Sequence, residues 1–150
     1  MVIGLIGENC VGKSTLADCI RDAIGAEVVT GRDYLRMASS EAEARRLFRE
    51  KLASAVGGGN IIYVISDSDQ SDLLPKGAIR ILVSADLETI KARFRARMRG
   101  VLPAPVEEML GRKHGMFDGG NYDYRFDGVN GDAAALCKQL ERIDGNTDED

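Results

Sequence analysis

The chain has 150 residues and a formal net charge of −4, with 44% hydrophobic and 29% charged residues. This length suffices for one globular domain and is too short for two ordinary ones, and the negative charge argues against a general nucleic-acid-binding surface. Because no apolar run is long enough to span a bilayer and residues 1–6 have no basic flank, we expect a cytoplasmic protein without a signal peptide or a membrane segment.

Hydrophobic patterns predict strands that alternate with helices along the chain. Residues 2–6 form an apolar, β-branched run that is typical of a buried parallel strand. The predicted strands are residues 2–6, 27–30, 60–65, 79–83 and 122–126. The predicted helices are residues 13–24, 33–56 with a break at 39–40, 87–99, 106–113 and 132–143. This order predicts a single α/β domain over residues 1–150, with a five-stranded parallel sheet and helices on both faces.

Two helix starts carry capping signals. Ser40 is followed three residues later by Glu43, which is a capping box, and Asp86 is a suitable N-cap for the next long helix. The acidic tail, residues 144–150, is expected to be frayed. The three cysteines lack C-x-x-C spacing and the chain has one histidine, so a zinc site is not expected.

Residues 7–14 match the pattern G-x-x-x-x-G-K-[ST] in full, between a predicted buried strand and a helix. The glycines allow a tight turn that points backbone N–H groups at phosphate oxygens, and the following helix adds its positive dipole end. Lys13 is expected to reach the β- and γ-phosphates, and the hydroxyl of Ser14 to bind Mg²⁺. The expected nucleotide-binding residues are Gly7, Glu8, Asn9, Cys10, Val11, Gly12, Lys13, Ser14 and Thr15.

This motif predicts ATP and Mg²⁺ as cofactors, but alone it indicates only triphosphate binding. No N-K-x-D or T-K-x-D guanine-reading motif follows the fourth predicted strand, and no helicase or transporter signature is present. The small size favours a small-molecule kinase, and the motif, together with the order of the elements, predicts a P-loop kinase fold.

The segment from Thr30 to Arg36 follows the second predicted strand, where open parallel sheets bind ligands. It resembles the T-G-D-x-L-R segment of adenylate kinases, with Arg32 inserted after the glycine. The resemblance implies that Thr30 and Arg36 hold an acceptor mononucleotide. Asp33 stands where shikimate-type and gluconate-type kinases carry an aspartate near the acceptor hydroxyl, so it is either a base or only a helix cap.

The third predicted strand runs into an acidic turn. Asp67 is the candidate to orient Mg²⁺ through water, and the alternative is an ordinary polar turn. Adenylate kinases carry a D-G-F-P-R run at this place, and this sequence lacks it.

Five basic residues occupy nine positions of the helix after Asp86. Lys91, Arg95 and Arg99 follow one side of its apolar stripe and are expected to face a phosphate cleft; Arg93 and Arg97 follow the other side and are expected in solvent. Arginines suit the charge that spreads over a transferring phosphoryl group. The alternative is a solvated amphipathic helix.

The C-terminal third resembles guanylate kinases in layout. The matching residues are Arg95, Arg99 with Gly100, Arg112, and the run Tyr122-Asp123-Tyr124. The resemblance implies that Arg95, Arg99 and Arg112 neutralise the transferring group. Residues 95–121, rich in glycine and proline, are expected to form a lid, with His114 as a polar residue on it.

Together these patterns predict a phosphotransferase that moves the γ-phosphoryl of Mg-ATP to a small acceptor, with a nucleoside monophosphate as the first hypothesis. The second is a kinase of a non-nucleotide hydroxyl with Asp33 as base. The third is a nucleotide-binding regulatory protein with little turnover. The sequence leaves open the acceptor and whether the protein is a monomer or a homodimer.

Overall fold

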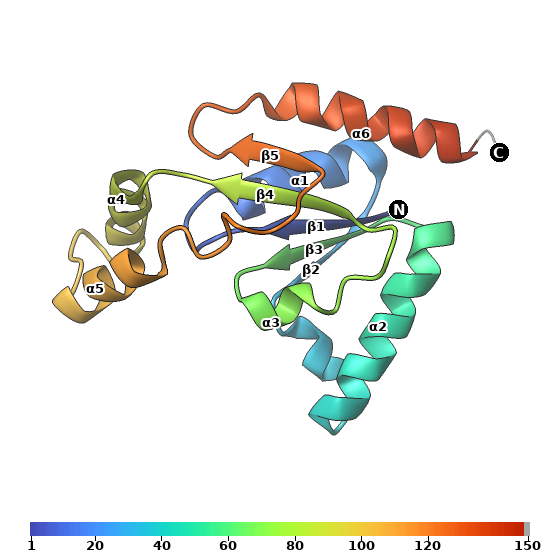
Figure 1. The fold of residues 1–150 in the computed structure, drawn as a ribbon, viewed down its shortest axis with the longest axis horizontal. Coiled ribbons are helices and arrows are strands. Elements are labelled where there is room, and N and C mark those ends of the chain that lie inside the picture. The colour runs from blue at the N-terminus through green and yellow to red at the C-terminus, as the bar shows by residue number, and fades with distance from the viewer. Residues whose placement is uncertain (149–150) are drawn as a thin grey trace.

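The structure is a computed structural model that describes residues 1–148. Five parallel strands form one sheet in the order β2–β3–β1–β4–β5 (Figure 1). The strands are β1 (Val2–Ile6), β2 (Glu27–Thr30), β3 (Ile61–Ile65), β4 (Ile79–Ser84) and β5 (Tyr124–Asp127). Every residue of β1 and β3 is buried, as their continuous apolar runs predict for central strands. The α/β prediction with a five-stranded parallel sheet is confirmed.

Helices cover both faces of the sheet (Figure 1). The helices are α1 (Lys13–Ile24), the 3₁₀ helix η1 (Asp33–Met37), α2 (Glu41–Gly57), α3 (Ser68–Ser71), α4 (Leu87–Arg97), α5 (Ala104–Lys113) and α6 (Ala133–Asp148). Helices α1 and α6 pack together on one face, and α2 and α3 lie on the other. Helices α4 and α5 lie beyond the carboxyl end of β4 (Figure 1).

Each face of the sheet has its own hydrophobic core. Ile3 and Leu5 of β1 point into the core beneath α1 and α6, while Val2 and Ile6 point into the core beneath α2. In the second core the ring of Phe48 stacks on Tyr34, with centroids 5.2 Å apart, and meets the edge of Tyr63 at 4.9 Å. The alternation along β1 therefore holds the phosphate loop, which follows it, on a strand that is packed from both sides.

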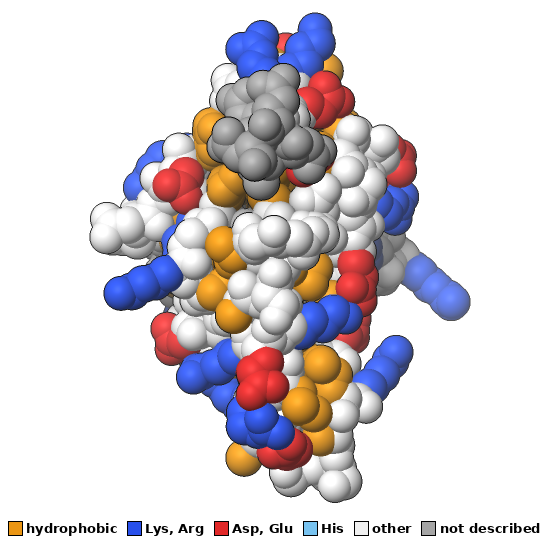
Figure 2. Space-filling view, turned by 90° about the vertical axis from the view of Figure 1, so that its right-hand side faces the viewer, with side chains coloured by type: hydrophobic (Ala, Val, Ile, Leu, Met, Phe, Trp, Pro, Cys, Tyr) orange, Lys and Arg blue, Asp and Glu red, His pale blue; other side chains and the backbone are white. Residues whose placement is uncertain are grey.

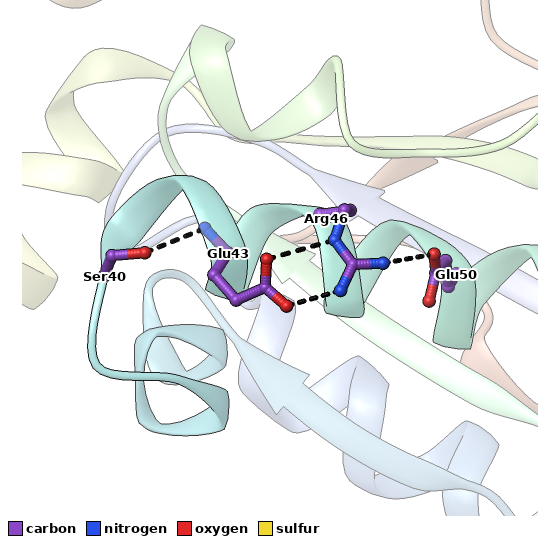
Figure 3. A network of polar contacts seen from close by, with 4 residues as sticks. All are labelled: Ser40, Glu43, Arg46 and Glu50. Atoms are coloured by element: carbon purple, nitrogen blue, oxygen red, sulfur yellow. Dashed lines mark hydrogen bonds and ion pairs between the residues drawn. The ribbon is translucent and has the colours of Figure 1, made fainter.

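The start of α2 is the predicted N-cap. The hydroxyl of Ser40 accepts a hydrogen bond from the backbone N–H of Glu43 at 3.2 Å (Figure 3). The carboxylate of Glu43 bonds Arg46, which also donates to Glu50 at 2.7 Å. The glutamate thus serves a salt-bridge chain along the helix surface, and only the Ser40 half of the capping box is formed.

Several element ends differ from the sequence prediction. Helix α4 stops at Arg97 rather than at residue 99, because Arg99 and Gly100 both have positive φ, 61° and 91°, and turn the chain out of the helix. Helix α5 begins at Ala104, two residues early, with Pro105 in its first turn, where proline costs little. Residues 144–148, expected to be frayed, continue α6, and the last two residues of that tail lie outside the described part.

The molecular surface at the amino ends of the strands mixes lysines and arginines with acidic side chains, and hydrophobic side chains are scattered among them (Figure 2). Within residues 1–148, no helix has the length and apolar character needed to cross a membrane.

Candidate functional site

The phosphate loop connects the carboxyl end of β1 to the first turn of α1. Its backbone turns through two left-handed residues, Cys10 with φ 65° and Gly12 with φ 105°. A Cβ on Gly7 would lie 2.4 Å from the carbonyl oxygen of Val83, so this first glycine is required by the close approach of β4. The loop therefore has the backbone conformation that lines N–H groups up around an anion.

The side chain of Lys13 is buried against this loop. Its Nζ donates to the carbonyl oxygens of Gly7 and of Ile65, the latter at 2.9 Å, and to Oγ of Ser66 at 2.7 Å. Burial lowers the pKa of the ammonium from 10.5 to about 8, against the opposing charge of Asp67. The cation is thus held at the ends of β1 and β3 by neutral oxygens, and phosphate oxygens would stabilise its charge better.

A pocket of 120 Å³ opens directly above Lys13. Its lining consists of the loop residues Asn9, Cys10, Gly12, Lys13, Ser14 and Thr15, together with Thr30, Val64, Ser66 and Arg97. The structure therefore brings the predicted acceptor residue Thr30 to the phosphate loop. The lining also includes Ser14, whose hydroxyl could hold Mg²⁺ beside a bound phosphate.

Helix α4, which carries most of the basic cluster, turns a different side toward the phosphate loop than the sequence predicts. Arg93 is half-buried, and its Nη1 donates to the carbonyl oxygen of Cys10 at 3.1 Å while its Nη2 donates to that of Gly128 at 2.9 Å. Arg97, one turn further, lines the pocket above Lys13. The expectation that Arg93 lies in solvent is wrong, because Ile90 anchors α4 in the core and leaves this side of the helix against the loop. Arg97 is exposed, as expected, although it reaches the pocket.

The three arginines chosen from the guanylate kinase resemblance are all exposed. Arg95 lies on the outer side of α4, Arg99 follows its end, and Arg112 lies on α5. Lys91 is turned toward α5, where it pairs with Glu107 at 3.4 Å. The catalytic role of the three arginines stays a prediction.

A larger cavity of 600 Å³ adjoins the phosphate pocket. Its walls come from the loop, from α1, from α4 through Arg93 and Arg97, and from the turn between β5 and α6. Phe126 supplies an aromatic wall, and the cavity size suits a small-molecule site. This arrangement can hold the nucleoside part of a nucleotide whose phosphates lie on the loop.

The turn between β5 and α6 was missed by the sequence reasoning. A Cβ on Gly128 would lie 1.8 Å from the carbonyl oxygen of Val11, and one on Gly131 would lie 2.4 Å from that of Asp127. The two glycines, three residues apart directly after the last strand, were the available signal for a close approach of this turn to another segment.

The Mg²⁺ candidate Asp67 and the acceptor-side candidates Asp33 and Arg36 lie in two different places. Asp67 is half-buried at the N-cap position of α3 and acts on the charge of Lys13, so it lies near the phosphate pocket. Asp33 and Arg36 lie exposed on η1, and Asp33 lines a separate cavity of 190 Å³ beside the edge strand β2. Arg32, the inserted residue, pairs with Asp69 at 3.5 Å.

Comparisons with known proteins bear on the fold. A scan against models of protein families finds no match, and no curated protein matches the sequence. A sugar kinase from a Janibacter species superposes with a TM-score of 0.62 at 18% identity, covering 93% of this chain and 91% of that chain. A shikimate kinase from Acinetobacter baumannii, in complex with shikimate, gives a TM-score of 0.63 at 16% identity, with coverage of 95% and 91%.

The YorR protein of Bacillus subtilis, in complex with phosphorylated GDP, gives a TM-score of 0.64 at 18% identity and covers 95% of both chains. At such low identities the likeness concerns the arrangement of the elements. Together with the loop geometry at Lys13, it establishes that this chain has the P-loop kinase fold.

Proposed function

We propose that this protein is a kinase that transfers the γ-phosphoryl group of Mg-ATP to a small acceptor. The observation that carries the proposal is the position of Lys13, whose ammonium sits at the ends of β1 and β3 and faces a pocket that Thr30 and Arg97 also line. A cation in the loop, an arginine from the lid side and a hydroxyl from the acceptor side surround one small space. Phosphoryl transfer requires this kind of positioning and charge stabilisation.

The donor would lie across the two adjoining cavities. The backbone N–H groups of the loop and the first turn of α1 would bind its phosphates, and the 600 Å³ cavity would take its nucleoside. Mg²⁺, when bound at Ser14 and backed by Asp67, would neutralise charge on the β- and γ-phosphates. Arg95, Arg99 and Arg112 keep their predicted role only if the lid moves them inward, since all three are exposed.

Two classes of acceptor follow from the sequence. A nucleoside monophosphate would use Thr30, which lines the phosphate pocket, and Arg36. A hydroxyl compound would use a carboxylate as base, with Asp33 as the candidate from sequence. The second class is supported by the sugar kinase and the shikimate kinase among the structural neighbours, whereas the YorR complex contains a guanine nucleotide. If Asp33 is that base, Asp33→Asn should abolish transfer to a hydroxyl and only weaken transfer to a phosphate.

The test is ADP release from Mg-ATP against a panel of nucleoside monophosphates and small hydroxyl compounds. Lys13→Ala should lower the turnover with any accepted compound by at least about 10²-fold. Lys138→Ala, an exposed lysine on α6, is the matched control and should leave turnover unchanged. Full activity of Lys13→Ala would contradict the proposal, and tight ATP binding without ADP release for any acceptor would favour a regulatory protein.

A further inference from the structure

Another cavity borders the phosphate loop, and neither the phosphates nor the nucleoside of ATP would occupy it in the binding mode proposed above. It has a volume of 480 Å³ and lies at the carboxyl ends of β4 and β5, where Ser84 and Arg125 line it. Glu8 of the phosphate loop forms one wall, and His114 and Asp118 of the lid form another. We call this space the Glu8 cavity. Its size falls in the range of about 300–1,000 Å³ that small-molecule sites occupy.

Glu8 lines this cavity, and both of its neighbours in sequence take part in the phosphate loop around Lys13. The residue before it, Gly7, accepts a hydrogen bond from Lys13 through its carbonyl, and the residue after it, Asn9, lines the phosphate pocket. Its side chain is only 12% exposed and bonds Nδ1 of His114 at 3.0 Å across 106 residues of sequence. A carboxylate of the phosphate loop is thereby fixed by His114 at the wall of the Glu8 cavity.

The charges that line the Glu8 cavity are predominantly negative. Asp86 and Asp127 join Glu8 and Asp118, against the single arginine Arg125. Hydrogen bonds from Thr89 lower the pKa of Asp86, and those from the backbone of residues 129 and 130 lower the pKa of Asp127, so both stay ionised at neutral pH. The guanidinium of Arg125 donates to the backbone of Asp118 at 3.3 Å and lies over the ring of Tyr122.

The excess of negative charge on the walls of the Glu8 cavity favours an uncharged ligand over an anionic one. A second phosphate or a carboxylate brought into the cavity would meet four carboxylates, and like charges at close range cost several kcal/mol. Hydroxyl groups suit the same walls, because carboxylate oxygens accept hydrogen bonds from them, and Ser84 can donate as well as accept.

We propose that the Glu8 cavity is the acceptor site, that it takes an uncharged polyhydroxyl compound of about monosaccharide size, and that Glu8, oriented by His114, accepts the proton of the attacking hydroxyl. This inference rests on the proposed kinase function and replaces Asp33 by Glu8 as the base.

The proposed reaction needs no reactant besides ATP and the acceptor. An acceptor hydroxyl oxygen forms a bond to the γ-phosphorus of ATP, and the bond between that phosphorus and the β,γ-bridging oxygen breaks. ADP leaves with the bond electrons, and the hydroxyl proton passes to the carboxylate of Glu8 and then to water. His114 acts as a positioning residue, because it contacts Glu8 and not the reacting atoms.

The experiment measures ADP release with Mg-ATP against neutral monosaccharides and polyols, in parallel with nucleoside monophosphates and hydroxy acids, and identifies the phosphate ester by ³¹P NMR. Neutral polyols should be the accepted class. Glu8→Gln keeps the shape of the side chain and should lower kcat by about 10²–10³-fold, since it removes only the base. Asp118→Asn should raise the KM for the acceptor, and the remote Asp22→Asn on α1 should change neither constant.

His114 is tested by a conservative pair of variants. His114→Asn keeps a donor near the position of Nδ1 and should retain kcat within a few-fold, whereas His114→Ala should lose most of the effect of Glu8. Turnover with acidic acceptors alone, or a Glu8→Gln variant with wild-type kcat on a neutral acceptor, would overturn this inference and leave the kinase proposal standing. No ADP release with any compound would overturn both.

Discussion

Arg93 binds the carbonyl oxygen of Cys10 at 3.1 Å, although 83 residues separate the two in sequence. Its other terminal nitrogen reaches Gly128 at 2.9 Å. One guanidinium therefore fastens helix α4 to the phosphate loop and to the turn between β5 and α6. These three segments form most of the wall of the cavity assigned to the nucleoside.

The first prediction concerns this guanidinium. Arg93→Ala should lower the free energy of unfolding by about 1.5–3 kcal/mol, the range for hydrogen bonds to charged groups, and should weaken ATP binding by about tenfold or more. Arg93→Lys should fall between, because an ammonium cannot fork onto both carbonyls. Urea unfolding and calorimetric ATP titration measure the two effects. Arg142→Ala on α6, an exposed arginine, is the control, and equal behaviour of the two alanine variants would refute the prediction.

The second prediction concerns the turn that Arg93 holds. Gly128→Ala places a Cβ 1.8 Å from the carbonyl oxygen of Val11, so the turn or the loop must shift. We expect a loss of about 1–3 kcal/mol of stability and a lower affinity for ATP. Gly57→Ala is the matched control, because a Cβ there meets no atom within 4 Å, and it should be neutral or stabilising by about 0.4–1 kcal/mol. Thermal unfolding of both variants decides between these outcomes.

Local sequence signals predicted the frame of the site well. The apolar run before Gly7 and the spacing from Gly7 to Lys13 are sufficient to predict a buried strand followed by a phosphate loop, because both depend on neighbouring residues. The Ser40 cap was predicted for the same reason. The boundaries that were missed, such as the end of α4 at Arg97, depend on positive φ at a non-glycine residue, which propensity does not indicate.

The contacts between distant segments could not be predicted. The apolar stripe of α4 shows that Ile90 is buried, but not which flank of the helix meets the loop, so Arg93 was assigned to solvent. In the same way, nothing near Glu8 in sequence indicates His114 as its partner. The resemblance to other kinases placed Asp33 by alignment of a short segment, while in the structure Asp33 lies beside β2, away from the pocket above Lys13.

The third prediction tests the cap of α2. Ser40→Ala removes the acceptor for the N–H of Glu43 and should cost about 1 kcal/mol of stability. Ser39→Ala, at the exposed neighbouring residue, should have almost no effect. Chemical denaturation of the two variants measures the difference. An equal effect of both substitutions would mean that the hydrogen bond in Figure 3 does not stabilise the helix.

The last prediction uses the pKa of Lys13. In the folded protein this pKa is lowered from 10.5 to about 8 by burial, so between pH 8 and 10.5 the unfolded chain holds a proton that the folded chain has lost. The unfolded state binds more protons in this window, and the stability contributed by this residue must therefore rise with pH.

The measurement is the free energy of unfolding of the wild type minus that of Lys13→Met, followed from pH 7.5 to about 10.5. Subtraction cancels the titration of the tyrosines and other lysines, and the difference should rise by up to about 3 kcal/mol. Saturating Mg-ATP should flatten the rise, because phosphate oxygens stabilise the ammonium and restore its affinity for the proton. Parallel curves for the two proteins without nucleotide would show that Lys13 is not desolvated in the empty loop, and the loop would then hold its lysine in water rather than against the carbonyl oxygens of Gly7 and Ile65.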